Sequence, residues 1–504
     1  MEFPYQVYDR SPYRIDVPFE ELQLGSDDYK HIREKFVHDF NGGTYAEISA
    51  LTTLPLLLCS VNMMIVGYLK SVSPWWQRIR GGDSTQTRPS DLSFFEHLLN
   101  IIFDTFTICF PFLIAVYYPE YLIYIYVIIF FLVLILYLIG GKLFCLPFST
   151  QTKEYVVIKP KEKGKKPIHL SIMIRILKSG VMIPTIICIF AVDFHDFPRR
   201  FCKTTTFGLS LMDIGTGCLI MNSGMAVSFS KLKNGFICTR FIKNLKSIPV
   251  TMAIATIGYF SRWFVNHPEL VTEYGVHWNF FWTIAVVNLA SSTITSPRFS
   301  LQTAMGMYIV YQVFLSLFGR DFIFNAPRDN FFTKNREGIL GSFGYICIYM
   351  IGIAYSDLSI KKSDTLKLGW KNPPASRTLI RLILMNLVAG LTTFICISYI
   401  EPYSRRCVNV AYGIAIASLV ITSMVFSYLV LTMLKSLQYC YVMSIIEGNQ
   451  FMFFMIGNLV MALYNITFMT TFHSNIIAIP VLMAYVVISL VLTDVCTRMG
   501  IKLK

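Results

Sequence analysis

A series of long apolar segments recurs over almost the whole chain and limits what it can fold into. A helix that crosses a bilayer needs about 20 consecutive, mostly apolar residues. Each segment that meets this requirement predicts a membrane-spanning helix, with boundaries accurate to a few residues. We predict thirteen such spans, at 48–69, 98–117, 121–141, 174–192, 207–230, 248–265, 278–296, 301–318, 339–356, 379–400, 410–433, 451–472 and 476–496.

Composition supports a membrane protein. Hydrophobic residues make up 54% of the 504 residues and charged residues only 15%, whereas a soluble domain carries about 25% charged residues. So little charge cannot cover a water-facing surface, which excludes a soluble enzyme, a nucleic-acid binder and a disordered chain. We predict an all-α, polytopic membrane helix bundle in one domain, residues 48–504. Residues 1–47 form a polar N-terminal segment, and we expect no cleavable signal peptide before the first span.

The placement of Lys and Arg predicts the orientation. Loops on the cytosolic side of membrane proteins are enriched in these residues. The loop 153–178 carries eight basic residues against two acidic ones, so we expect it to be cytosolic. Alternating outward from it, most other basic clusters fall on the same side. The N-terminus is then lumenal and the C-terminus cytosolic.

Three loops on the opposite side carry basic residues against this bias: 193–203, 320–337 and 401–406. Pairing with acidic neighbours or lipid headgroups is one explanation, and an anionic substrate is the other. For any single loop the two are balanced. Three such loops on one face favour the substrate.

Several common chemistries have no motif in the sequence. There is no P-loop, no GxSxG elbow, no HExxH and no Gly-rich dinucleotide fingerprint. The 12 cysteines are scattered without a CxxC pair, so we interpret them as small buried hydrophobic residues and predict no metal site and no cofactor. The one glycosylation sequon, at Asn465, lies inside a predicted span, where a glycan cannot be attached.

The best candidate for chemistry is Asp193 together with Lys203, at the exit of the fourth span and the entry of the fifth. A carboxylate beside a hydroxyl acts as a general base. A nearby ammonium stabilises the oxyanion of a thioester under attack. An ordinary ion pair at the helix ends is the alternative, and the spacing alone favours it.

Four further residues are weaker candidates. Asp213 and Asp104 lie within predicted spans, where acids are expensive and by default functional; the small residues near Asp213 equally suit close helix packing. His277 precedes an aromatic run and is either an interfacial anchor or a catalytic group. Cys202 could carry an acyl group, but only His195 lies near it in sequence.

Several strings in the second half and near the N-terminus resemble the GPI inositol acyltransferase family, that of the fungal GPI-anchored wall transfer proteins and the animal class W proteins of phosphatidylinositol-glycan biosynthesis. The resemblance runs in order from about Phe36 to the C-terminus, and the strings at 273–281 and 335–339 are its most specific part. The matching stretches are FVHDFNGGT at 36–44 with Glu47 and Ile48, FPRRF at 197–201 with Lys203, LMDIG at 211–215, EYGVHWNFF at 273–281, NREGI at 335–339, YSRR at 403–406, Asn449 and Asn458.

The resemblance implies an endoplasmic reticulum enzyme of thirteen spans. Its members transfer a fatty acyl group, usually palmitoyl, from acyl-CoA as co-substrate to the inositol 2-hydroxyl of glucosaminyl-phosphatidylinositol, an early step of GPI-anchor assembly. The acid–base pair of the family corresponds to Asp193 and Lys203. Cys202 stands where the family typically has Ala, which argues against an acyl-cysteine.

The working hypothesis is direct transfer of the acyl group. Asp193 accepts the inositol proton, and Lys203 stabilises the thioester oxyanion or orients Asp193. Arg199 and Arg200 hold a phosphate of the substrate or of CoA. The residues expected to line or brace the site are Asp213, His277, Asn335 and Arg336.

Two questions stay open at this point. Acyl-CoA is supplied in the cytosol, whereas Asp193 and Lys203 are predicted to be lumenal. Another membrane acyltransferase with a sugar acceptor remains an alternative, and so does a lipid flippase or secondary transporter, although no two-fold internal repeat supports the latter.

Overall fold

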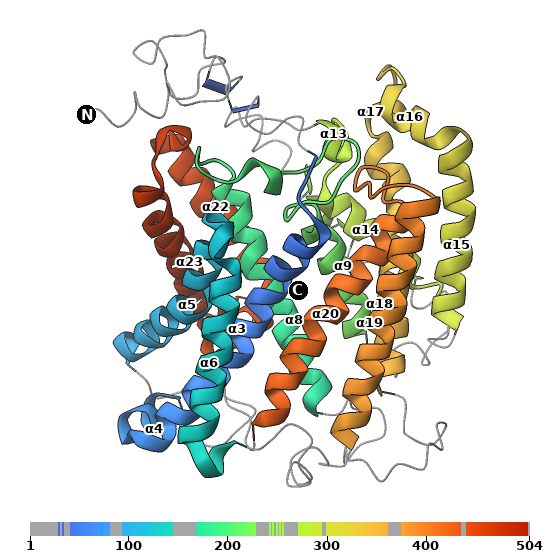
Figure 1. The fold of residues 1–504 in the computed structure, drawn as a ribbon. Coiled ribbons are helices and arrows are strands. Elements are labelled where there is room, and N and C mark those ends of the chain that lie inside the picture. Colours follow the sequence, from blue (N-terminus) through green and yellow to red (C-terminus); the bar gives the residue numbers. More distant parts are fainter. Residues whose placement is uncertain are drawn as a thin grey trace.

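The computed structural model is almost entirely helical. It describes residues 29–30, 33–34, 41–80, 93–144, 168–227, 241–242, 244–245, 248–249, 251–253, 255–256, 271–294, 299–360, 374–434 and 440–501. Within these ranges, ten helices are long and apolar enough to cross a membrane, and most of them extend between the upper and lower ends of the molecule in Figure 1, several at a tilt. The predicted all-α membrane bundle is therefore confirmed.

The ten helices are α3 (Tyr45–Val72), α5 (Phe94–Tyr117), α6 (Leu122–Gly140) with the preceding η2 (Pro119–Tyr121), α8 (Ile168–Ala191), α15 (Ser300–Phe314) continued by η7 (Leu315–Gly319) and α16 (Arg320–Asn325), α18 (Arg336–Ile360), α19 (Pro374–Tyr399), α20 (Val410–Met433), α22 (Gln450–Thr467) and α23 (Asn475–Arg498).

Three of the thirteen predicted spans are not among these ten helices. The fifth, 207–230, is wrong in extent: α9 (Ile214–Ala226) has 13 residues, because the chain before it forms a turn around Asp213. The seventh contains α14 (Phe280–Ser291), with 12 residues. At about 1.5 Å per residue, neither reaches the roughly 30 Å of a bilayer core. The sixth, 248–265, lies largely outside the described residues. The number thirteen and the orientation remain predictions.

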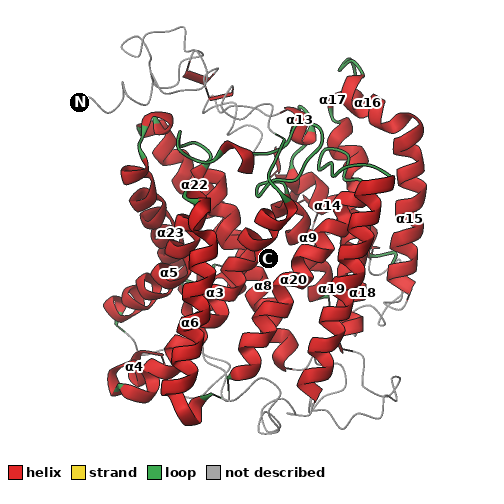
Figure 2. Ribbon diagram, viewed as in Figure 1, coloured by secondary structure: helices red, strands yellow, loops and turns green. Residues whose placement is uncertain are grey.

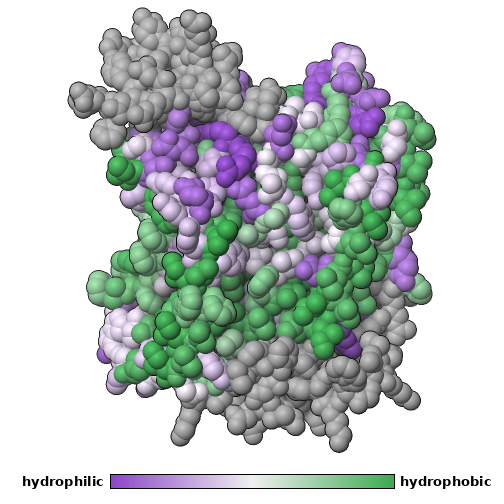
Figure 3. All heavy atoms as spheres, in the orientation of Figure 1, coloured by the Kyte–Doolittle hydropathy of each residue, from purple (hydrophilic) through white to green (hydrophobic). Residues whose placement is uncertain are grey.

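The bundle has an inner and an outer set of helices. Helices α3, α8, α18 and α20 are buried along most of their spans, whereas most residues of α6, α15 and α19 are exposed or half-buried. The exposed side chains of the outer set are large and apolar, for example Phe130 on α6 and Leu387 on α19. Lipid tails satisfy such surfaces, so packing within the bundle depends on close fit. On the face shown in Figure 3, hydrophobic residues cover much of the middle and lower part.

Glycines allow the backbones of α9 and α18 to approach closely inside the bundle. A β-carbon on Gly224 would lie 2.2 Å from the carbonyl oxygen of Tyr349, and one on Gly352 would lie 2.3 Å from that of Met221. Both distances are impossible for real atoms in contact. Small residues that let two helix backbones approach are the usual packing device in membranes, and they hold the short α9 against α18.

We expect Gly352→Val to destabilise the protein, because the added side chain must push α9 away from α18. Overpacking of this kind costs about 1–3 kcal/mol. The expected result is less monodisperse protein on size-exclusion chromatography and a lower melting temperature in detergent. Gly306→Val on α15 is the matched control, since a β-carbon at Gly306 would have no neighbouring atom within 4 Å. Equal behaviour of the two variants would contradict the packing argument.

One end of the bundle carries a set of ordered loops. They follow α8 (192–213), precede α14 (275–279), precede α18 (326–335) and connect α19 to α20 (400–409). The short helices α13 (Val271–Tyr274), α17 (Phe331–Lys334) and η5 (Arg199–Phe201) belong to the same region, at the upper end in Figure 2. We call this region the loop layer. The basic loop 153–178, predicted to be cytosolic, lies mostly outside the described residues.

Candidate active site

Hydrogen bonds join segments of the loop layer that are far apart in sequence. The Gly208 amide donates to the Tyr403 carbonyl at 2.8 Å, and the Val276 amide donates to the Lys334 carbonyl at 3.0 Å. The Ser404 hydroxyl donates to the Thr206 carbonyl at 2.7 Å. The three basic loops predicted to share one face therefore do lie together. Hydrophilic residues also gather at this end in Figure 3.

Asp213 organises the centre of the loop layer. Its side chain is fully buried and accepts hydrogen bonds from the Thr204 hydroxyl (2.9 Å), the Ser210 amide (3.1 Å) and Arg405 Nε (2.7 Å). Because a buried carboxylate is costly unless it is paired, these bonds force the chain to turn at 204–213 before α9 begins. Asp213 therefore braces the region and does not line an open site.

Arg405 extends this contact into a row of alternating charges. Its Nη1 lies 3.9 Å from Glu273 Oε1, and Lys203 Nζ lies 2.6 Å from Glu273 Oε2. Burial by itself lowers the pKa of Arg405, but Asp213 and Glu273 raise it above the ordinary value, so Arg405 stays charged. Lys203 and Glu273 lie at the accessible end of this row, with side chains 23% and 21% exposed.

Three further arginines of the basic loops also have acidic partners. Glu337 is fully buried between Arg328 (2.5 Å) and Arg406 (2.9 Å). Arg320 approaches Glu401, which is itself buried, at 3.6 Å. The structure thus favours pairing with acidic neighbours as the reason for these residues. Our inference that three basic loops indicate an anionic substrate is not needed to explain them.

Asp193 lies at the end of α8, with its side chain 9% exposed. One carboxylate oxygen accepts a hydrogen bond from Arg33 Nη2 at 2.7 Å, and the other accepts one from Asn465 Nδ2 at 2.7 Å. Arg33 belongs to the segment before α3, and Asn465 to the last turn of α22. Three distant parts of the chain therefore meet at this carboxylate.

The expected ion pair between Asp193 and Lys203 is absent from the structure, although both residues lie in the described part of the loop layer. Asp193 pairs with Arg33, and Lys203 pairs with Glu273. The reason is that both partners come from segments distant in sequence, which the spacing of 193 and 203 cannot reveal.

Asp196 fixes the same loop to α23. It accepts hydrogen bonds from His195 Nδ1 and from the Asn475 amide, both at 3.0 Å. The hydrogen bond from His195, followed by its charge and the Asn475 amide, outweighs partial burial and holds the pKa of Asp196 below its ordinary value. Asp196 is therefore ionised at neutral pH. It lies against the first residue of α23, Asn475, and the start of a helix favours a nearby negative charge.

Arg199 and Arg200 have partners of their own. Arg199 folds back onto the end of α8 and donates to the carbonyls of Val192 and His195 at 3.0 Å each, and to that of Phe194. Arg200 forms a two-pronged contact with Glu47, the closest distance being 2.8 Å, and is about half exposed. Of the two, Arg200 is the more exposed and therefore the better placed to contact an external phosphate.

Asn335 fixes the backbone of the segment 273–281 through hydrogen bonds. The buried Asn335 Oδ1 accepts hydrogen bonds from the His277 and Trp278 amides at 2.8 and 2.9 Å. Arg336, also buried, donates from Nε to the Ile323 carbonyl at 2.8 Å. Both residues therefore brace the loop layer. The His277 ring is exposed and stacks on Phe331, with centroids 6.3 Å apart.

The environments of two other candidates, Cys202 and Asp104, indicate structural roles. Cys202 is fully buried, and burial raises the pKa of its thiol, which opposes a role as nucleophile. Nine of the ten cysteines described as free thiols are buried, as predicted. Asp104 accepts hydrogen bonds from the Tyr441 and Val442 amides at 2.7 and 3.3 Å, so it caps the short helix α21 (Tyr441–Gly448).

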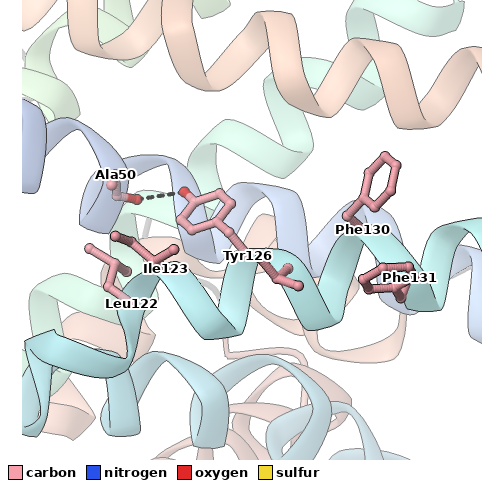
Figure 4. A pocket seen from close by; sticks show the side chains of 7 residues that line it. Ala50, Leu122, Ile123, Tyr126, Phe130 and Phe131 are labelled. Carbon is pink, nitrogen blue, oxygen red and sulfur yellow. Dashed lines mark hydrogen bonds between the residues drawn. The ribbon is translucent and has the colours of Figure 1, made fainter.

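An apolar groove opens between α3 and α6, with a volume of about 470 Å³. Tyr126 closes one side by donating to the Ala50 carbonyl at 2.8 Å (Figure 4). Ala50 lies one turn of α3 beyond Glu47, the partner of Arg200. The groove therefore begins just below the loop layer, and its walls suit a hydrocarbon chain. Its lining residues are Ala50, Leu122, Ile123, Tyr126, Val127, Phe130 and Phe131.

Sequence reasoning did not identify four residues as partners of the candidate residues. Arg33 and Asn465 contact Asp193, Glu273 contacts Lys203, and Arg405 contacts Asp213. Three of them carried a signal. Glu273 and Arg405 belong to strings that carry the family resemblance, and Asn465 stood out as a sequon in an apolar segment. Arg33 carried none, because one Arg in a polar segment is unremarkable.

The chain is similar to a known protein family over nearly its whole length. The model of the GWT1 family matches residues 29–496. The chain is 30% identical to the glucosaminyl-phosphatidylinositol-acyltransferase PIGW of Homo sapiens, over 81% of this chain and 79% of that protein. It is 27% identical to GPI-anchored wall transfer protein 1 of Candida albicans, over 91% and 96%. It is 25% identical to the phosphatidylinositol-glycan biosynthesis class W protein of Dictyostelium discoideum, over 88% and 93%.

Proposed function

Because this chain belongs to the GWT1 family, whose model matches residues 29–496, we propose that it is an O-acyltransferase of GPI-anchor biosynthesis. Its acceptor is glucosaminyl-phosphatidylinositol, the substrate in the name of the human relative. Its donor is a fatty acyl-CoA, with palmitoyl-CoA as the first choice, and it works in the endoplasmic reticulum membrane. The match over nearly the whole chain carries this proposal.

The reaction is a direct transfer to the inositol 2-hydroxyl. Asp193 accepts the proton as the hydroxyl oxygen attacks the thioester carbon. A C–O bond forms, the C–S bond breaks, and the proton passes to the CoA thiolate as it leaves. The products are the acylated inositol lipid and CoA. A carboxylate that is only 9% exposed, just beyond the end of α8, suits this task, because little water competes for it.

Lys203 has a different part in the proposal. Its ammonium stabilises the negative charge that develops on the thioester oxygen. The pairing with Glu273 fixes the position of Lys203, whose side chain is 23% exposed. Arg200, half exposed, is available for a phosphate once it releases Glu47. The buried Asp213, Asn335 and Arg336 keep these loops in place, and His277 faces outward beside them.

The groove between α3 and α6 supports a lipid-like donor. Each CH₂ group removed from water contributes about 0.8 kcal/mol, so an acyl chain gains much of its binding energy on such a wall. The groove starts below the loop layer, which would bring a thioester at its upper end toward the polar groups.

The test uses purified full-length protein in detergent or nanodiscs. Release of CoA from palmitoyl-CoA is measured with and without glucosaminyl-phosphatidylinositol, and the acylated lipid is identified by mass spectrometry. We expect CoA release only when the acceptor is present. A related sugar acyltransferase would prefer another acceptor, and a flippase or transporter would move lipid without releasing CoA; either result refutes the proposal.

A further inference from the structure

Within the described part of the chain, both partners of Asp193 carry a second polar atom that has no hydrogen-bond partner. Arg33 donates from Nη2 and Asn465 from Nδ2, each at 2.7 Å. Arg33 Nε and Asn465 Oδ1 are buried, and each is without a partner in the described part of the chain. The Arg33 side chain is 10% exposed and Asn465 is 8% exposed. Native proteins rarely leave buried polar atoms unpaired, so these two indicate a polar ligand.

The two atoms offer complementary chemistry beside one carboxylate. Each belongs to the same planar group as the nitrogen that contacts Asp193, so both lie close to that carboxylate. Arg33 Nε–H is a donor and Asn465 Oδ1 is an acceptor. A hydroxyl group can donate and accept at once, so one hydroxyl matches the donor and the acceptor, and a second hydroxyl on the adjacent carbon of the same ligand matches the carboxylate.

We propose that Asp193, Arg33 and Asn465 form a subsite for two hydroxyls on adjacent carbons of a polyol headgroup. Asp193 faces the hydroxyl that is acylated, while Arg33 Nε and Asn465 Oδ1 hold its neighbour. This inference rests on the proposed function and adds to it the means by which the enzyme selects its acceptor. A lipid with a single hydroxyl leaves one donor and one acceptor unpaired, and is rejected.

The subsite also gives a reason for an Asn at position 465 that does not involve glycosylation. The amide is buried against Asp193, so it is not a glycan acceptor in the folded protein. Thr467, the third residue of the sequon, is exposed and donates to the Leu463 carbonyl of its own helix at 2.7 Å. Asn465 is thus in place for its contact with Asp193, whatever the identity of residue 467.

The first experiment compares Asn465→Ala with the wild type in the acyl-transfer assay. We expect KM for glucosaminyl-phosphatidylinositol to rise about tenfold, and KM for palmitoyl-CoA to stay within twofold. Thr467→Ala is the matched control: it removes the sequon, leaves the amide, and should keep both KM values. A binding measurement with the acceptor lipid alone, without acyl-CoA, should show the same tenfold loss for Asn465→Ala.

The second experiment uses an acceptor that lacks the hydroxyl next to the acylated one. The wild type should lose about tenfold in kcat/KM with this analogue, whereas Asn465→Ala should lose little more than it has already lost. Such non-additivity identifies a direct interaction between the two groups. An analogue that lacks a hydroxyl on the far side of the ring serves as the control and should affect both proteins equally.

Several results would overturn the subsite. If Asn465→Ala lowers kcat alone and treats both acceptors alike, Asn465 only orients Asp193. A wild type that accepts the two lipids equally well would also refute the subsite, although transfer to glucosaminyl-phosphatidylinositol would still support the proposed function. If the wild type transfers no acyl group at all, the proposed function fails, and equal binding of the acceptor lipid to both proteins would then reject the subsite independently.

Discussion

Replacing Asp193 with Asn should lower the rate of acyl transfer by about 10²–10⁴-fold, the usual contribution of a positioned general base. Asn has nearly the same shape: its oxygen can still accept from Arg33, and its NH₂ can donate to Asn465 once the Asn465 amide turns over, so the protein should still fold. The measurement is CoA release at saturating acyl-CoA and acceptor, on protein quantified by size-exclusion chromatography.

Asp196→Asn is the matched control for Asp193→Asn. Asp196 lies on the same loop and is ionised and hydrogen-bonded, but to His195 and Asn475. We expect this variant to keep its turnover within a few-fold of the wild type. If Asp193→Asn retained wild-type turnover in folded protein, Asp193 would not be the base. If both variants lost activity equally, the loss would reflect disorder of the loop.

Asp213→Ala should have the largest effect on stability. It leaves the Arg405 guanidinium buried and without its closest acidic partner, and breaking a buried pair from one side costs about 3–5 kcal/mol. The amides of Thr204 and Ser210 lose an acceptor as well. We expect a sharply lower yield of monodisperse protein and a lower melting temperature in detergent.

Two further variants isolate the cause of this loss. Asp213→Ala combined with Arg405→Met removes both charges, and should recover part of the stability that Asp213→Ala loses, because no uncompensated charge stays buried. Arg200→Ala breaks an ion pair with an exposed member and should cost no more than about 1 kcal/mol. A double variant as unstable as Asp213→Ala would mean that the lost hydrogen bonds, and not the buried charge, determine the effect.

Hydropathy predicted the bundle well because a spanning helix satisfies all its backbone hydrogen bonds within one segment. Ten predicted spans correspond to helices long enough to cross a membrane. The prediction was wrong where a polar residue changed the backbone. At Asp213, an apolar window could not reveal that the carboxylate binds the amide of Ser210, so that α9 begins only at Ile214.

The sequence by itself determined the local properties of the chain: which segments are apolar enough to enter a membrane, and which strings it shares with its family. These follow from residues close together along the chain. Only the tertiary structure decided which charges meet, because Arg33 and Asn465 reach Asp193 from segments 160 and 272 residues away. Buried charges must find partners wherever the fold brings them, and spacing along the chain carries no record of that.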